Sequence, residues 1–269
     1  MTDAVSRHAL VCAAGKRVSV AVSPDALAGG AFAAQRIADV LHSVSGRAPV
    51  LGLATGRSVA PIYAALVEVF RRHELDARQL VTFNLDEYVG IPSDHPASFR
   101  CFMHAHLFDP AGIPASSCHF PDAHESDGND GFERFERAIR AAGGIDLQLL
   151  GIGVNGHVAF NEPGSDPSSR TRRVALASAT LAENAPSFAG LGPMPREAVT
   201  MGIATILETR RVLLVAWGRA KAEPLRRAFH GAVSPECPAS FLQLHPGPVE
   251  LVVDRESARE LVLADEGGT

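Results

Sequence analysis

The sequence predicts an α/β fold built on a mostly parallel β-sheet. Short runs rich in leucine and β-branched residues alternate with longer alanine-rich segments of helical period, which is the pattern of successive βαβ units. The 269 residues are 46% hydrophobic and 20% charged, so the chain holds enough apolar material for one sizeable core. We find neither an internal repeat nor a low-complexity linker, and we therefore expect a single domain over residues 1–269.

Six apolar runs are predicted to form strands, and two longer segments are predicted to form helices. Four of the strands are Ala48–Leu53, Leu80–Leu85, Asp146–Ile152 and Val212–Trp217, and two outer strands are Val18–Val22 and Val249–Val253. The segment Pro24–Val44 is expected to be a helix with proline at an early position, where the fixed φ of proline suits a helix start. A second helix over Pro61–His73 carries apolar side chains on one face, at Ile62, Ala65, Leu66, Val69 and Phe70.

Charge and cysteine content exclude several classes of protein. The 30 acidic and 25 basic residues give a net charge of -5 and are scattered, without a Lys/Arg run that could follow a phosphate backbone or anchor on anionic lipid. No apolar stretch approaches the ~20 residues of a membrane span, and no secretion signal is recognisable. The four cysteines are widely separated and form neither a zinc motif nor a disulfide framework. We expect a cytoplasmic protein with reduced thiols and with neither nucleic acid nor membrane as a partner.

Polar residues follow four of the predicted strands at the point where each strand ends. In an open parallel sheet, ligands bind outside the carboxyl ends of the strands, where neighbouring loops converge. The four sites are Thr55-Gly56-Arg57-Ser58, Asp86-Glu87, Asn155-Gly156-His157 and Gly218-Arg219-Ala220-Lys221. Their coincidence predicts one shared active centre, and hence an enzyme.

The segment Gly153–Pro163, GVNGHVAFNEP, is suited to proton transfer. Histidine ionises near neutral pH and can therefore both accept and donate a proton. Asn155 precedes His157 by two positions and Glu162 follows it by five, and a carboxylate can fix the tautomer of the imidazole. The alternative is a histidine that only satisfies a local hydrogen bond.

Asp86 and Glu87 are candidates for a general base. Acidic residues after a strand often cap the next helix instead. The sequence that follows them, Tyr-Val-Gly-Ile-Pro, is a poor helix start, which weakens that alternative and leaves at least one carboxylate available as a base.

The turn Thr55–Ser58 and Lys221 together predict an anion site. A Thr-Gly-x-Ser turn that leads into a helix offers backbone N–H groups, hydroxyls and a helix N-terminus to an anion, and the lysine adds a point charge. The alternatives are an ordinary turn and a solvated lysine. His104 and His106 do not make a metal-ligand set by themselves, and no metal site is expected.

Several motifs together resemble the glucosamine-6-phosphate deaminase family, within the larger group that includes 6-phosphogluconolactonase. They are VTFNLDEYVG, SDHPASF, GIGVNGHVAFNEPGS, SSRTR and SFLQLHP, and the resemblance extends from Gly52 to Asp254. The segments DEY and FNEP favour the deaminase over the lactonase. The resemblance implies a three-layer, doubly wound, Rossmann-like sheet of the phosphosugar deaminase/6-phosphogluconolactonase type. It also implies that glucosamine 6-phosphate and water are converted to fructose 6-phosphate and ammonia without a cofactor.

The resemblance assigns a role to each matched residue. His157, oriented by Glu162 and assisted by Asn155, would open the pyranose ring, and Asp86 would move a proton from C2 to C1. Residues that would bind substrate or its phosphate are Thr55, Gly56, Arg57, Ser58, Glu87, Gly153 and Lys221. A homo-oligomer is expected because the family forms them.

Departures from the family pattern put the identity of the sugar in question. Pro186 stands where many members carry an arginine that grips the substrate phosphate, and Asn155 stands where aspartate is common. Arg57 and Val59 also replace the usual glycine and proline of the loop. Either another arginine substitutes for the missing one, or the substrate is not an ordinary hexosamine phosphate. The candidates for that substitution are Arg57, Arg173 and Arg196.

Two residues match the region that holds an allosteric effector in some bacterial members, Ser165 and Arg172. Val174 replaces a basic residue there, so half a site remains and strong activation is not expected. Other hypotheses are a deaminase or isomerase of a different amino sugar, whether phosphorylated or not, a phosphosugar lactonase or isomerase on the same fold, and a non-catalytic sugar-phosphate-binding regulator. The intact DEY and GH…NEP segments argue against the regulator.

Overall fold

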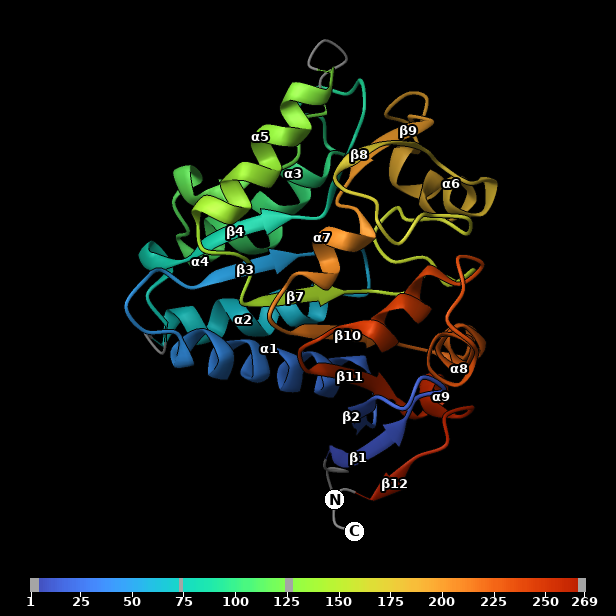
Figure 1. Ribbon diagram of the computed structural model, residues 1–269. Helices are drawn as coiled ribbons and strands as arrows, with labels where there is room; N and C mark the ends of the chain where they lie inside the picture. Colours follow the sequence, from blue (N-terminus) through green and yellow to red (C-terminus); the bar gives the residue numbers. More distant parts are fainter. Residues whose placement is uncertain (1–4, 73–74, 124–127, 266–269) are drawn as a thin grey trace.

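The computed structural model describes residues 5–72, 75–123 and 128–265. Within these ranges, a nine-stranded sheet has the order β12-β1-β2-β11-β10-β7-β3-β4-β6. The strands from β2 to β6 in this order are parallel, whereas β1 and β12 add an antiparallel edge. The predicted α/β class with a mostly parallel sheet is confirmed (Figure 1). The bounds are β1 (Ser6–Val11), β2 (Arg17–Ser23), β3 (Val50–Leu53), β4 (Val81–Asn84), β6 (Cys118–His119), β7 (Leu147–Leu150), β10 (Val212–Ala216), β11 (Val249–Asp254) and β12 (Ala264–Asp265).

Helices cover the sheet on both faces. Figure 1 shows α1 and α2 on one side and α5 and α7 on the other, which is the arrangement that right-handed crossovers produce when the chain winds outward in both directions. The α-helices are α1 (Ala26–Ser43), α2 (Ala60–Arg71), α3 (Phe99–Met103), α4 (Asp109–Ala111), α5 (Gly128–Ala141), α6 (Ser178–Asn184), α7 (Ile203–Leu207), α8 (Ala222–His230) and α9 (Arg255–Ala258).

Helices α1 and α2 begin and pack for reasons that are visible in the sequence. Asp25 caps α1 by accepting a hydrogen bond from the backbone N–H of Ala28 at 2.8 Å. Pro61 lies in the first turn of α2, where its missing N–H costs nothing. A Cβ atom on Gly30 would lie 2.8 Å from that of Pro61, so the glycine permits the close approach of the two helices.

A second, smaller sheet lies beside the carboxyl ends of the main strands. Its strands are β5 (Asp86–Tyr88), β9 (Glu197–Thr200) and β8 (Arg172–Ala175), all paired antiparallel. The buried side chains under it form a separate apolar cluster, which consists of Tyr88, Phe160, Leu176, Phe188 and Ala198. This sheet was not predicted. The chain leaves β4 at Asn84 and turns at once into β5, so acidic residues expected in a loop form a strand.

The motif SFLQLHP near the C-terminal end connects neighbouring elements of the fold through hydrogen bonds. The amide nitrogen of Gln243 donates to the backbone oxygens of Ala228 and Gly231 at 2.8 and 2.9 Å. The imidazole of His245 contacts the backbone oxygen of Thr209 at 2.9 Å. These contacts join the short helical segment Pro238–Leu244 to the end of α8 and to the turn between α7 and β10.

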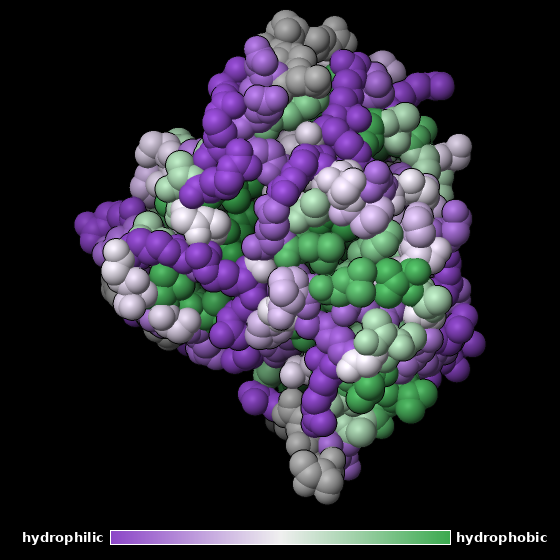
Figure 2. Space-filling model, viewed as in Figure 1, coloured by the Kyte–Doolittle hydropathy of each residue, from purple (hydrophilic) through white to green (hydrophobic). Residues whose placement is uncertain are grey.

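The surface view shows hydrophilic side chains over much of one face, with apolar side chains gathered in several patches between them (Figure 2). Across the described part of the chain, no helix combines the length and the apolar character needed to cross a membrane.

Candidate active site

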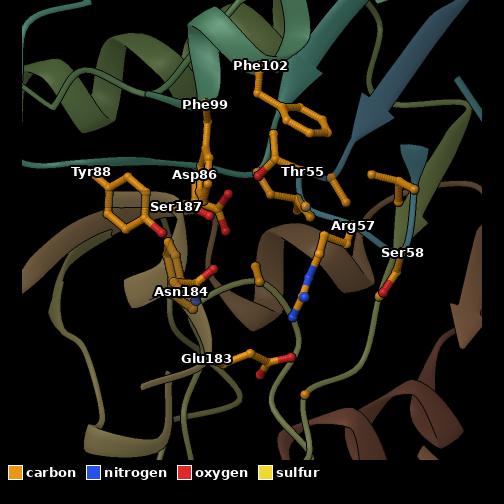
Figure 3. A pocket seen from close by; sticks show the side chains of 18 of the residues that line it. Thr55, Arg57, Ser58, Asp86, Tyr88, Phe99, Phe102, Glu183, Asn184 and Ser187 are labelled. Carbon is orange, nitrogen blue, oxygen red and sulfur yellow. The ribbon is translucent and has the colours of Figure 1, made fainter. Parts of the chain in front are cut away.

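A cleft of about 560 Å³ opens at the carboxyl ends of β3, β4, β7 and β10 (Figure 3). One wall comes from the main sheet and the other from the segments around α3 and α6. Each of the four predicted polar sites contributes to the lining, through Thr55, Gly56, Arg57, Ser58, Asp86, His157 and Lys221, and the predicted Gly153 lines the cleft beside them. The opposite wall includes Pro96, Ala97, Ser98, Phe99, Phe102, Glu183, Asn184, Pro186 and Ser187.

The turn after β3 leads directly into α2. Gly56 has a φ of 108°, a left-handed conformation that favours glycine. The indole N–H of Trp217 donates to the backbone oxygen of Ser58 at 2.7 Å, which fixes the turn against the end of β10. The N-terminal end of α2 therefore faces the cleft from a rigid position, as an anion site requires.

Asp86 lies on the floor of the cleft and is 5% exposed. Burial, together with the charge of neighbouring Glu87, raises the pKa of Asp86 well above its usual value. Its strand β5 is held in register by pairing with Thr200 of β9. A carboxyl group with a raised pKa at a fixed place is suited to accept a proton and to return it.

Glu87 is turned into the protein instead. Its carboxylate accepts hydrogen bonds from the backbone N–H groups of Tyr88, Phe99 and Arg100, each at 2.9 Å. The last two belong to the first turn of α3, so Glu87 helps to cap that helix. Glu87 is not among the residues that line the cleft, and its role in substrate binding stays a prediction. The helix that Glu87 caps begins twelve residues later in the sequence, so capping of the next helix, the alternative considered for the acidic pair, applies to Glu87 and leaves Asp86 free of that role.

His157 is held from behind by Asn155 and Glu162. The side-chain oxygen of Asn155 lies 2.8 Å from Nδ1 of His157 and also accepts the backbone N–H of His157 at 3.1 Å. The side-chain nitrogen of Asn155 donates to Glu162 at 2.7 Å, and Nδ1 of His157 lies 3.4 Å from the same carboxylate. Because the asparagine oxygen is an acceptor, Nδ1 carries the proton, and Nε2 keeps its lone pair.

His157, Asn155 and Glu162 form a hydrogen-bonded relay, and Glu162 is its negatively charged member. Burial by itself would raise the pKa of Glu162, but hydrogen bonds from His157, Thr180 and Asn155 outweigh it and lower the pKa to about 2. The hydroxyl of Thr180 donates to its second oxygen. A carboxylate that stays ionised behind the imidazole stabilises positive charge on the ring.

The backbone around His157 leaves room for its ring. A Cβ atom on Gly153 would lie 2.2 Å from Cε1 of His157, so no larger residue fits there without moving the imidazole. Ala159, two residues after the histidine, has a φ of 51°, an unusual value for a residue with a side chain. Gly153 thus serves the site through its lack of a side chain.

Two cations lie at the other end of the cleft. The ammonium of Lys221 is 3.6 Å from a carboxylate oxygen of Glu183, and the two side chains are 13% and 38% exposed. Arg57 is exposed and forms neither a hydrogen bond nor an ion pair within the described ranges. Figure 3 shows Arg57 extending toward Glu183. Glu183 was missed by sequence reasoning, because it lies 38 positions before Lys221 and belongs to no recognisable motif.

Only one of the three candidate replacement arginines lines the cleft, and it is Arg57. Arg173 forms an ion pair with Glu197 of the adjacent strand β9. Pro186 itself lines the cleft, in the turn that follows α6. Among the three candidates, Arg57 is therefore the one whose position in the cleft lets it replace the missing arginine.

Ser165 and Arg172 are brought together behind the relay. The guanidinium of Arg172 donates to Oγ of Ser165 at 3.3 Å and to the side-chain oxygen of Asn161 at 2.8 Å. Oγ of Ser165 in turn donates to the backbone oxygen of Glu162 at 2.7 Å. Burial lowers the pKa of Arg172 in this position.

An aromatic cluster forms the apolar side of the cleft. The ring of Tyr88 lies 4.6 Å from that of Phe99 and 5.7 Å from that of Phe160. All three residues line the cleft, and a sugar ring could pack against them. As for metals, the described residues contain no group of three His, Cys, Asp or Glu side chains that could hold an ion.

Fold and site together define the class: a doubly wound α/β enzyme whose cleft joins acid–base groups to a cationic end. The family model for glucosamine-6-phosphate isomerases/6-phosphogluconolactonase matches residues 24–252. The chain belongs to this family.

Known relatives cover most of the chain. It is 43% identical over 251 residues to a glucosamine-6-phosphate deaminase of Marinomonas sp. (strain MWYL1), which is 92% of this chain and 93% of that protein. It is 48% identical over 211 residues to the Rhodopirellula baltica glucosamine-6-phosphate deaminase, with coverage of 78% and 84%.

Solved structures agree with this assignment. A monomeric glucosamine-6-phosphate deaminase superposes with a TM-score of 0.85 at 36% identity, over 90% of this chain and 99% of that one. The 6-phosphogluconolactonase of Trypanosoma brucei, at 20% identity, has a TM-score of 0.73 over 90% and 98%. The second likeness shows a shared fold. The predicted resemblance to the deaminase family is confirmed.

Proposed function

We propose that the protein is a glucosamine-6-phosphate deaminase that converts glucosamine 6-phosphate and water to fructose 6-phosphate and ammonia. The observation that carries the proposal is the placement of a tautomer-fixed histidine, His157, and a buried carboxyl, Asp86, in one cleft with the cations Arg57 and Lys221. The relatives with this activity in their names support the choice of reaction.

The first step in this mechanism is the opening of the sugar ring. Nε2 of His157 accepts the proton of the anomeric hydroxyl and delivers it to the ring oxygen as the C1–O bond of the ring breaks. Asn155 and Glu162 hold the imidazole through Nδ1 and stabilise the charge that it carries between the two transfers. They act through His157 and are positioning residues.

The second step moves a proton from C2 to C1. Asp86 removes the C2 proton from the open-chain aldehyde, the electrons of the C2–H bond form a double bond between C1 and C2, and the C1 oxygen takes a proton from the substrate's ammonium group, which gives an enolamine. Asp86 returns its proton to C1, and the nitrogen lone pair forms an iminium group at C2. Water adds to that carbon, ammonia leaves, and the ketone of fructose 6-phosphate remains. The raised pKa of Asp86 matches a group that must hold and release one proton in each turnover.

The phosphate is assigned to the cationic end of the cleft. Lys221 and Arg57 supply charge, and the turn Thr55–Ser58 supplies hydroxyl and backbone donors at the start of α2. The sugar ring then lies between this end and Asp86, against the aromatic cluster of Tyr88, Phe99 and Phe160.

The test is turnover on a panel of substrates. The purified protein is incubated separately with glucosamine 6-phosphate, free glucosamine and 6-phosphogluconolactone, and ammonia, ketose phosphate and acid release are measured. We expect ammonia and fructose 6-phosphate from the first, and little from the others. Efficient deamination of free glucosamine would transfer the assignment to an unphosphorylated amino sugar. Lactone hydrolysis without ammonia would replace it by a lactonase.

The proposal extends to the setting of the enzyme. We place it in the cytoplasm, as an enzyme that hydrolytically releases ammonia in amino-sugar metabolism, and we expect a homo-oligomer with weak or no allosteric activation through Ser165 and Arg172. The solved relative described above is a monomer, and a monomeric state of this protein would contradict the expected homo-oligomer. Light scattering on the purified protein measures the oligomeric state directly, with and without N-acetylglucosamine 6-phosphate.

A further inference from the structure

Charges at the cationic end of the cleft do not all favour an anion. Lys221 and Arg57 attract a phosphate group, but Glu183 lines the same part of the cleft and carries a negative charge at neutral pH. Its carboxylate lies 3.6 Å from the ammonium of Lys221, and Figure 3 shows Arg57 extending toward it from the opposite wall. In the absence of ligand, this carboxylate is the anion that Lys221 contacts.

The two partners come from different parts of the fold. Lys221 follows β10 of the main sheet, and Glu183 lies in the last turn of α6, beside the smaller sheet. The lysine side chain is 13% exposed and lines the cleft, so an anion that enters the cleft meets its ammonium where Glu183 already lies 3.6 Å away.

We propose that Glu183 is a built-in competitor for Lys221, which the anionic group of the substrate must displace, and that it thereby weakens the binding of phosphorylated ligands. This inference rests on the proposed function for the identity of the anion. A phosphate dianion near Lys221 meets the repulsion of the carboxylate as well as the loss of the ion pair. Both effects disappear when Glu183 is made neutral, whereas an uncharged sugar meets neither.

The expected magnitude is modest because the carboxylate of the pair is 38% exposed. A partly exposed ion pair contributes little by itself, and charge repulsion across a wet cleft is strongly screened. We therefore expect the change Glu183→Gln to tighten phosphate binding by roughly three- to tenfold. Free glucosamine should show no such gain, so the variant increases the preference for the phosphorylated sugar.

Glu223 offers a matched control. It is an acidic residue two positions after Lys221 whose carboxylate faces Arg226 and Arg227 on α8, at 3.8 and 3.7 Å. The change Glu223→Gln removes the same charge close to Lys221, but from a side chain outside the cleft lining. A general effect of net charge would tighten phosphate binding in both variants, whereas competition for Lys221 would tighten it in Glu183→Gln alone.

Calorimetric titration of the full-length protein with inorganic phosphate tests the inference without using catalysis. We expect the dissociation constant of phosphate to fall by roughly three- to tenfold in Glu183→Gln and to stay within about twofold in Glu223→Gln. A parallel fall in KM for glucosamine 6-phosphate, with kcat nearly unchanged, would agree. Unchanged or weaker phosphate binding in Glu183→Gln, or equal gains in both variants, would overturn the inference.

The titration also separates this inference from the proposed function. If the wild-type protein releases no ammonia from glucosamine 6-phosphate, the function fails, while tighter phosphate binding by Glu183→Gln still supports the competitor role. If ammonia is released but the variant binds phosphate as the wild type does, only the competitor role fails. Glu183→Ala serves as a second variant, and thermal unfolding of each variant verifies that it is folded.

Discussion

The two ends of the cleft are built in different ways. At the acid–base end, Nδ1 of His157 is hydrogen-bonded to Asn155 at 2.8 Å, Asn155 in turn donates to Glu162 at 2.7 Å, and Asp86 is 5% exposed. At the cationic end, Arg57 is exposed and Lys221 faces a half-exposed carboxylate at 3.6 Å. The proton-transfer groups are thus fixed before substrate arrives, whereas the anion contacts form on binding. Changes at the first end should therefore reduce kcat, and changes at the second should alter KM.

The largest expected effect is that of Asp86→Asn. The amide cannot carry the C2 proton, so kcat for glucosamine 6-phosphate should fall by about 10⁴-fold, at the upper end for a positioned acid or base. Stability should change in the opposite direction. The raised pKa of Asp86 means that the ionised group costs stability above its unfolded pKa, so the neutral variant should be more stable at neutral pH. Steady-state kinetics and denaturant unfolding check the two halves, and a stable variant with near-normal turnover would assign the proton transfer to another group.

The next effect is that of His157→Gln at the same end. Glutamine keeps a polar side chain but cannot pass a proton between two oxygens, so turnover of the cyclic sugar should fall by roughly 10²-fold. An open-chain analogue bypasses ring opening and should lose much less. Kinetics on both substrates measure the difference, and equal losses would contradict the ring-opening role.

At the cationic end, Lys221→Ala should mainly raise KM for the phosphorylated sugar. One charge-assisted hydrogen bond contributes roughly 1.5–3 kcal/mol, which corresponds to about ten- to a hundredfold in binding. Arg57→Ala should produce a smaller increase, because its side chain is exposed and pays more entropy on ordering. A fall in kcat with constant KM in either variant would show that the two ends are not separable as described.

The smallest effect concerns acid stability and Glu162. Its pKa is about 2 in the folded protein, against 4.5 for the unperturbed group, so the folded state favours the carboxylate. The corresponding stability is complete above pH ~4.5–5 and is lost as the pH falls toward 2. Unfolding measured by denaturant at several pH values should show a steeper decline between about pH 4.5 and 2 in wild type than in Glu162→Gln. Parallel declines would mean that other carboxylates dominate.

Six of the nine strands of the central sheet, β2, β3, β4, β7, β10 and β11, could be predicted from the sequence because each contains a run of apolar residues. The edge strand β1, which is partly exposed, and the two-residue strands β6 and β12 were not predicted. The predicted run Val212–Trp217 corresponds to β10, all of whose residues are buried, and Asp146–Ile152 contains β7. The smaller sheet has no such signal. In β8, half-buried residues alternate with exposed ones, and β5 has three residues, so neither produces a recognisable apolar run.

Local motifs located the acid–base end better than the cationic end. The segment that contains Asn155, His157 and Glu162 is contiguous, and its internal spacing already indicates a relay. By contrast, Glu183 and Lys221 meet only through tertiary packing, and Glu87 caps a helix that begins far along the chain. Pairings of this kind depend on how α3 and α6 fold over the sheet, which local sequence does not encode.

The most direct measurement of the central claim follows glucosamine 6-phosphate by NMR with wild type and with Asp86→Asn side by side. We predict that the wild-type protein forms ammonium and fructose 6-phosphate in equal amounts and that each ketose has gained one proton at C1. The variant Asp86→Asn should remain folded and form neither product at a comparable rate. Absence of ammonium with wild type, ammonium without the ketose, or equal turnover by the two proteins would contradict the account.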